Sequence, residues 1–111
     1  MIRVPREIQL IASRAIDENL ARPISQRASY KDSGNKRIPG TGMRTARRLK
    51  SGQVSQAQIK LMVAWFARHG ESPKEAKARK DKTSKAAIAW ALWGGTPGEK
   101  WAKRRLRKMN P

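Results

Sequence analysis

Apolar residues recur at helical spacing in several separate segments of this chain. Over 5–20, 55–69 and 99–109 they return every three or four residues, which is the spacing of one face of an α-helix. The stripes are formed by Ile8, Ile11, Ala12, Ala15, Ile16 and Leu20, by Ile59, Met62, Val63 and Phe66, and by Ala102, Leu106 and Met109. A narrower seam of Met43, Ala46 and Leu49 predicts a short helix that ends at Gly52.

One further segment, 86–93, is apolar on every side. A helix without a polar face belongs inside a core, so we expect the other helices to pack around it. Gly94 follows as a left-handed residue, and the Thr-Pro-Gly-Glu run over 96–99 predicts a capping box that starts the last helix. The pattern favours core positions for Trp65 and Trp90 more than for Trp93 and Trp101, which flank this turn.

Together these elements predict an all-α fold of about four to five helices in a single compact domain over 1–111. Residues 21–41 show no period and are rich in glycine, proline and cations, so we expect a long, flexible basic loop between the first and second helices. Two interpretations of this loop stay open: a solvated flexible loop, or a basic arm that becomes ordered on nucleic acid. Residues 71–84 are expected to form a charged connector that allows a short helix over 73–80.

The charge of the chain predicts the kind of partner that the protein binds. Its 111 residues hold 26 Lys and Arg against 8 Asp and Glu, which gives a net charge of +18 and a pI of about 11.6. Self-repulsion on that scale favours a polyanionic partner. We therefore expect DNA or RNA to be bound through phosphates, with low sequence specificity. The candidate contacts are Arg27, Lys31, Lys36, Arg37, Arg44, Arg47, Arg48, Lys50, Lys100, Lys103, Arg104, Arg107 and Lys108.

Catalysis and metal binding find little support. The chain has no cysteine and one histidine, and its eight carboxylates are scattered, so we expect no catalytic residues, no metal and no cofactor. His69 is expected to cap the last carbonyls of its helix or to interact with the helix dipole. Because no run approaches the roughly 18 apolar residues of a membrane span and the first residues lack an apolar signal core, we also expect a soluble, unprocessed chain without membrane contact.

The sequence also offers two more specific binding modes. Gly40 and Gly42 precede a predicted helix, where backbone N–H groups can hold a phosphate, but the P-loop lysine and hydroxyl are missing and a simple turn is the better interpretation. The predicted helices around 51–54 also suggest a helix-turn-helix. The second of them offers mainly Gln56, Gln58 and Lys60 to base edges, so backbone contact is favoured over base reading.

Three blocks together resemble a small module of tailed phages. They are Gly40-Thr41-Gly42 with Arg44, Ala46 and Leu49, then Val54-Ser55 through Met62 to Phe66-Ala67-Arg68-His69, and then Ile88-Ala89-Trp90 through Trp93-Gly94-Gly95 to Gly98 and Trp101. The module recurs in phage-encoded proteins of poorly defined function, sometimes attached to head or maturation-protease polypeptides. The resemblance implies a fold and a phage origin, with the host cytoplasm or the virion as location, and it transfers no active site.

A phage origin leaves a second function open beside nucleic-acid binding. The same basic face would dock on an acidic surface of a host enzyme, or on a protein of the phage head, because complementary charge accelerates such an encounter. The sequence leaves oligomeric state and the choice between DNA and RNA undetermined.

Overall fold

The computed structural model describes residues 1–110, which form six α-helices, one 3-10 helix and four short strands. The α-helices are α1 (Arg6–Leu20), α2 (Thr41–Ser51), α3 (Gln56–Gly70), α4 (Pro73–Arg79), α5 (Lys85–Leu92) and α6 (Gly95–Met109). The other elements are η1 (Ile24–Gln26) and the strands β1 (Ile2–Arg3), β2 (Tyr30–Ser33), β3 (Lys36–Pro39) and β4 (Gln53–Val54). None of the helices over 1–110 is long and apolar enough to cross a membrane.

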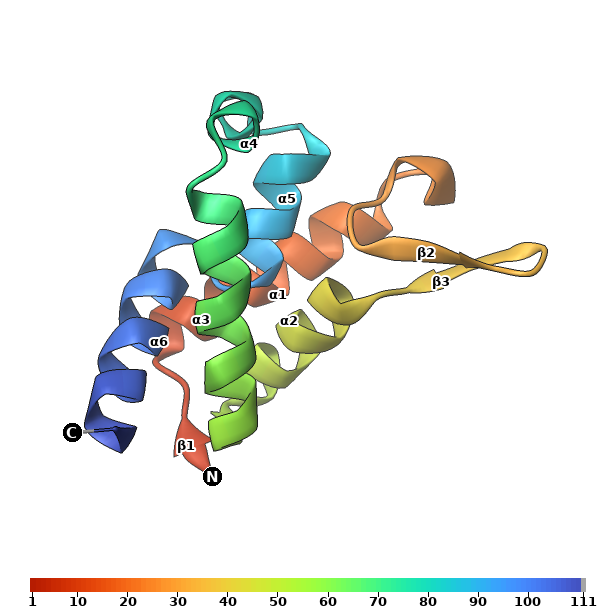
Figure 1. The fold of residues 1–111 in the computed structure, drawn as a ribbon. Helices are drawn as coiled ribbons and strands as arrows, with labels where there is room; N and C mark the ends of the chain where they lie inside the picture. Colours follow the sequence, from red (N-terminus) through yellow and green to blue (C-terminus); the bar gives the residue numbers. More distant parts are fainter. Residues whose placement is uncertain (111) are drawn as a thin grey trace.

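The core lies where α1 packs against α2, α5 and α6, and where α3 packs against α6 (Figure 1). Its innermost side chains include Ala12 from α1, Met43 and Leu49 from α2, and Met62 from α3, all of them completely buried. The predicted stripes are therefore the buried faces of these helices. The stripe of α1 ends earlier than predicted, because Leu20 at its last position is 41% exposed.

The prediction of an all-α fold holds only at the coarse level, because the mostly helical chain also contains two antiparallel pairs of strands. Near the N-terminus β1 pairs with β4, with Ile2 opposite Val54. The segment 21–41 was predicted without regular structure, but it contains η1 and the hairpin β2–β3, with Tyr30 opposite Pro39. The hairpin turns at Gly34, whose φ of 63° suits a residue without a Cβ, and it projects from the helical body (Figure 1).

The turn between α5 and α6 lies near its predicted place but is built differently. Gly94 is left-handed as predicted, with a φ of 106°. However, α6 begins at Gly95, so Thr96 is not an N-cap and the predicted capping box is absent. The Thr96 hydroxyl instead accepts a hydrogen bond from the indole nitrogen of Trp90 at 3.2 Å.

The expected ranking of the tryptophans is reversed. Trp93 and Trp101, which flank the turn, are 3% and 6% exposed, whereas Trp65 and Trp90 are only partly buried against the core. Helix α5 is correspondingly less enclosed than its sequence predicts, and only Ile88 and Leu92 in it are buried. Other helices nonetheless surround α5, which contacts α1, α2, α4 and α6.

Serine side chains cap the start of three helices. Ser55 accepts a hydrogen bond from the backbone N–H of Gln58 at 3.1 Å at the start of α3. The allowed helix in the charged connector is present as α4, which Ser72 caps by accepting from Glu75. Ser84 caps α5 in the same way.

Candidate nucleic-acid interface

The candidate phosphate contacts fall into two groups on different sides of the molecule. The first group lies on the segment before β2, on the β2–β3 hairpin and on α2, which adjoins β3. We call it the hairpin–α2 face: Arg27, Lys31, Lys36, Arg37, Arg44, Arg47, Arg48 and Lys50. The second is the α6 face: Lys100, Lys103, Arg104, Arg107 and Lys108. Figure 1 shows the hairpin and α6 at opposite sides of the helical body.

Several residues of the hairpin–α2 face also hold the fold. Arg27 donates to the backbone oxygens of Leu20 and Arg22, each at 3.0 Å, and its guanidinium lies over the Tyr30 ring. It therefore closes the C-terminal end of α1 against the hairpin. Arg37 pairs across the hairpin with Asp32 at 3.7 Å. Lys31 and Lys36 are exposed and free of such contacts within residues 1–110.

The cations of α2 likewise comprise some that bond to the chain itself and some that are free in solvent. Arg44 donates to the Pro39 carbonyl and the Thr41 hydroxyl, both at 3.2 Å, and Arg48 donates to the side-chain oxygen of Gln58 at 2.8 Å. Arg47 and Lys50 point to solvent from the side opposite the buried seam. These two are consequently the α2 cations with most freedom to meet a phosphate.

Helix α6 buries Trp101 and Ala102 on its inner side and exposes its cations on the outer side. Lys103 pairs with Glu99 one turn earlier at 3.3 Å. Lys100, Arg104, Arg107 and Lys108 are exposed, and none forms a recorded ion pair in the described chain. The α6 face is therefore a row of cations along a single helix.

The charge of the chain is hardly neutralised internally. Of its 26 Lys and Arg, only Arg37 and Lys103 form an ion pair with a carboxylate within residues 1–110. An exposed pair of this kind contributes little to stability. Most of the positive field thus remains directed to solvent, where it attracts anions.

His69 lies in the last turn of α3, where the predicted interaction with the helix dipole places it. Its side chain bonds Glu75 instead of capping the helix: Nδ1 is 2.7 Å from a carboxylate oxygen of Glu75, and the ring stacks on Trp65. The carbonyl of His69 accepts from Arg79, which also covers the ring of Trp90 at 4.1 Å. These contacts fasten α4 to α3. No cluster of three or more candidate metal ligands occurs within residues 1–110.

One of the polar residues that the helix-turn-helix interpretation relies on, Gln58, is not free to contact a base. Gln58 is 3% exposed, and its side chain donates to the Thr45 hydroxyl while it accepts from Arg48. The solvent side of α3 presents Gln56 and Lys60 near its start and Arg68 near its end, with the apolar Leu61 and Ala64 between them. Base reading by α3 is therefore limited to a few residues near its two ends.

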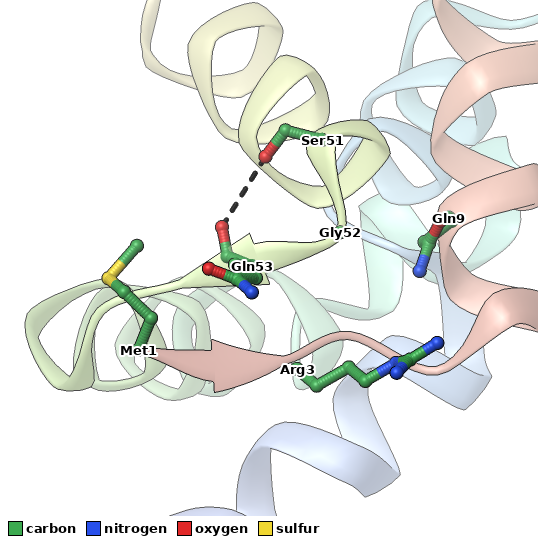
Figure 2. Close-up of a pocket in the computed structure, with 6 residues that line it drawn as sticks. All are labelled: Met1, Arg3, Gln9, Ser51, Gly52 and Gln53. Carbon is green, nitrogen blue, oxygen red and sulfur yellow. Dashed lines mark hydrogen bonds between the residues drawn. The ribbon is translucent and has the colours of Figure 1, made fainter.

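Three hollows adjoin the basic surface. The first, of about 470 Å³, lies beside α6, and its lining includes Lys100 and Arg104 together with Glu7. The second, of about 480 Å³, lies beside the β1–β4 pair and is lined by Met1, Arg3, Gln9 and 51–53, with Arg3 as its one charged side chain (Figure 2). The third is larger, about 620 Å³, and lies between the start of α2, the beginning of β2 and the C-terminal half of α3. We call it the Trp93 groove, because Trp93 lines it together with Lys31, Gly42, Leu61, Trp65 and Arg68.

Arg68 and the indole of Trp93 were not among the predicted site residues. The sequence signals close to this groove are the candidate contact Lys31 and the pair of glycines at 40 and 42, for which the sequence favours a simple turn. Comparison of the chain with protein-family models, with curated proteins and with solved structures gives no match. The resemblance to a tailed-phage module accordingly stays a prediction.

Proposed function

We propose that this protein binds nucleic acid mainly through phosphates, with little sequence preference, and that the hairpin–α2 face makes the principal contact. The observation that supports the proposal is the excess of exposed cations that carry no carboxylate partner. A polyanion that meets them releases its condensed counterions, which drives binding without any base contact. The hairpin–α2 face is favoured because two adjoining elements contribute to it, whereas α6 presents one row.

Low sequence preference follows from the kinds of side chain available. Lysine and arginine on exposed surfaces suit phosphate oxygens, whose positions are the same for every sequence. Glutamine and asparagine side chains that read adenine need freedom to reach a base edge. Gln58 has none, because it is buried and bonded to Thr45 and Arg48.

The test is a salt titration of binding to duplex DNA, single-stranded DNA and RNA, with heparin as a control polyanion. The variant Lys36→Gln/Arg47→Gln/Lys50→Gln removes three exposed cations from the hairpin–α2 face. Its matched control, Lys100→Gln/Arg104→Gln/Lys108→Gln, removes three exposed cations from α6 and lowers the net charge equally. We expect the first variant to reduce the slope of log K against log salt by about 2–3, and the control to reduce it by less than about 1.

Two results would contradict the proposal. Equal loss in the two variants would mean that net charge alone, and not this face, sets the affinity. The second result is binding that disappears at about 0.15 M salt, where the Debye length is about 8 Å, and that never prefers nucleic acid to heparin. The basic surface would then be better explained as a docking surface for an acidic protein.

A further inference from the structure

The start of α2 gathers hydrogen-bond donors that have no acceptor within residues 1–110. The backbone N–H groups of Thr41 and Gly42 lie in the first turn of α2, where a helix provides no acceptor. The helix dipole adds a partial positive charge at the same place. Ser29 stands next to them, and its hydroxyl oxygen accepts from the N–H of Met43 at 3.3 Å.

Trp93 adds a donor from a different part of the chain. Its side chain is 3% exposed and lines the groove, yet its indole N–H donates no hydrogen bond in the described chain. The indole of Trp90, by contrast, has Thr96 as its acceptor. The completely buried side-chain nitrogens without a partner over 1–110 are those of Arg37 and Arg105 and do not include the indole nitrogen of Trp93. The free N–H of Trp93 is therefore open to the groove, where it is available to donate to a ligand.

Glycine at position 42 lets Ser29 and Trp93 lie against the first turn of α2. A Cβ built on Gly42 would lie 2.6 Å from the Ser29 hydroxyl oxygen and 3.2 Å from the Trp93 indole nitrogen. The φ of Gly42 is not in the left-handed region, so backbone conformation alone does not demand glycine here. What glycine provides is the close approach that brings the Trp93 donor beside those of α2.

The rest of the groove sets the chemistry of what enters it. Lys31 and Arg68 supply positive charge, and the only carboxylate among the lining residues, Glu75, is bonded to His69. The wall from α3 is apolar and aromatic: Leu61 is 49% exposed, and Trp65 stacks on Trp93 at 4.9 Å with an interplanar angle of 11°. A fitting ligand is therefore an anion attached to a flat, weakly polar body.

We propose that the Trp93 groove holds one unstacked nucleotide of a single strand, with its phosphate at the donors of α2 and Trp93 and its base against Leu61 and Trp65. The inference rests on the proposed binding of nucleic acid. The groove adds a preference for single-stranded segments to the proposed function, because a base inside a duplex does not reach this wall. The ring of Trp65 already stacks on His69 and Trp93, so the base meets Leu61 and the edge of Trp65. Such apolar contact is tolerant of base identity, in keeping with low sequence preference.

The direct test follows the indole N–H resonances of the four tryptophans during titration of the full chain with deoxythymidine monophosphate, a short oligothymidine, a blunt duplex and inorganic phosphate. Trp93→Phe assigns the resonance of Trp93. We expect the mononucleotide and the oligothymidine to shift that resonance saturably, and the blunt duplex to leave it in place. A Trp93 resonance that does not move with any nucleotide, or that inorganic phosphate alone moves as far, would overturn the assignment.

Variants then separate this site from the phosphate-binding face. Gly42→Ala forces Ser29 and Trp93 away from the first turn of α2 and so separates the donors, and Leu61→Gln alters the exposed wall without touching the core. Each should weaken oligothymidine binding about tenfold, which corresponds to one hydrogen bond to a charged group or one apolar contact, while blunt-duplex binding stays unchanged. Leu10→Gln, at a 40% exposed position on α1 away from the groove, is the matched control and should change neither.

The outcomes distinguish the two proposals. In one outcome, duplex binding responds to the hairpin–α2 variant, but oligothymidine binding is unchanged in Leu61→Gln and Gly42→Ala. This would rule out a nucleotide site in the Trp93 groove and leave the proposed function intact. In the other outcome, the mononucleotide shifts the Trp93 resonance but the protein binds no nucleic acid near physiological salt. This would rule out the proposed function and leave a nucleotide site in the groove.

Discussion

Asn19 is a fully buried amide that fixes the chain after α1 to the helix itself. Its side-chain nitrogen donates to the carbonyl of Ala28, and its side-chain oxygen accepts from the N–H of the same residue, each at 2.9 Å. The nitrogen also approaches the sulfur of Met43 at 3.2 Å. One polar side chain thus satisfies the backbone of a buried residue immediately before the hairpin.

Replacing Asn19 with alanine should lower the free energy of unfolding by about 2–4 kcal/mol. The reason is that both backbone groups of Ala28 would remain buried without partners, at roughly 1–3 kcal/mol for each unsatisfied group. Denaturant unfolding followed by circular dichroism measures the change. Asp17→Ala, at an exposed position on the same helix, is the control and should remain within about 0.5 kcal/mol of the parent. A loss below 1 kcal/mol at Asn19 would mean that water replaces the amide.

Arg27 shows how far a sequence can identify a site residue. Its charge and its place in a basic segment made it a candidate phosphate contact, but the structure uses its planar fork on the carbonyls of Leu20 and Arg22. Sequence patterns report which residues carry charge, and they do not report which backbone groups lie within reach. Lys31 and Lys36 carry the same signal and remain exposed, so the sequence alone does not separate the two kinds of cation.

At the scale of elements, the predictable parts were those with a buried face. The stripes of α1, α3 and α6 follow from a period of 3.6 because one side of each helix meets the core. The β2–β3 hairpin escaped prediction because its strands have four residues each and none of them is buried, so no alternation of apolar and polar positions marks it. Its one local signal was Gly34-Asn35, a dipeptide typical of tight turns.

The order of the tryptophans was unpredictable for a related reason. Their burial depends on how closely α5 and α6 approach, and that approach is set by two glycines rather than by the apolar pattern. A Cβ on Gly98 would lie 2.9 Å from the carbonyl oxygen of Trp93, and one on Gly94 would lie 3.1 Å from the Cα of Gly98. Contact between backbones, which periodicity does not encode, brings Trp93 and Trp101 inside.

Because of this close approach, the effect of Gly98→Ala on stability should be opposite to the effect expected from helix propensity. Gly98 lies inside α6, where alanine is normally favoured over glycine by about 1 kcal/mol. We expect Gly98→Ala to destabilise the protein instead, by about 1–3 kcal/mol, because backbone must shift to admit the methyl group. Thermal unfolding measures it.

Gly70→Ala provides the comparison for Gly98. Near Gly70 the crowded atoms belong to the side chains of Trp90 and Glu99, at 3.3 and 3.4 Å, and side chains adjust more easily than backbone. We expect a smaller effect there than at position 98. If Gly98→Ala raised the melting temperature, α5 and α6 would have to be farther apart than described.

The connection between α4 and α5 carries a small dependence on pH. The Thr83 hydroxyl and then its backbone N–H donate to Asp81, and these hydrogen bonds lower the pKa of that carboxyl below its usual value of 3.8. A lowered pKa means that the contact stabilises the folded chain above about pH 4 and that this stabilisation is lost as pH falls through the folded-state value. Thr83→Val removes the hydroxyl donor and should raise the pKa of Asp81 toward 3.8.

Carboxyl carbon chemical shifts, recorded over a pH titration, test the effect of Thr83→Val directly. Asp32, which is also exposed and close to an arginine, provides an internal reference because Thr83 does not contact it. An Asp81 titration midpoint that is the same in the parent and in Thr83→Val would show that the hydroxyl does not hold the carboxylate in solution.

At the scale of the whole molecule, the net charge of +18 is confined to a body of 44 × 29 × 26 Å. At 0.01 M salt the Debye length is about 30 Å, so cations on opposite sides still repel one another, whereas at 0.15 M it is about 8 Å and only near neighbours do. Attraction offers little compensation, because Arg37 and Lys103 are the only Lys or Arg in ion pairs over 1–110. Repulsion between like charges therefore dominates the electrostatic part of stability.

We accordingly expect the melting temperature to rise as sodium chloride increases from about 0.01 to 0.15 M. For a domain of this size, each kcal/mol of relieved repulsion corresponds to about 4–8 °C. The Lys100→Gln/Arg104→Gln/Lys108→Gln variant, which starts with less repulsion, should gain less from the same salt. A melting temperature that falls with salt in both proteins would mean that attraction outweighs repulsion in the folded state, and the basic surface would then have no electrostatic need of a polyanion.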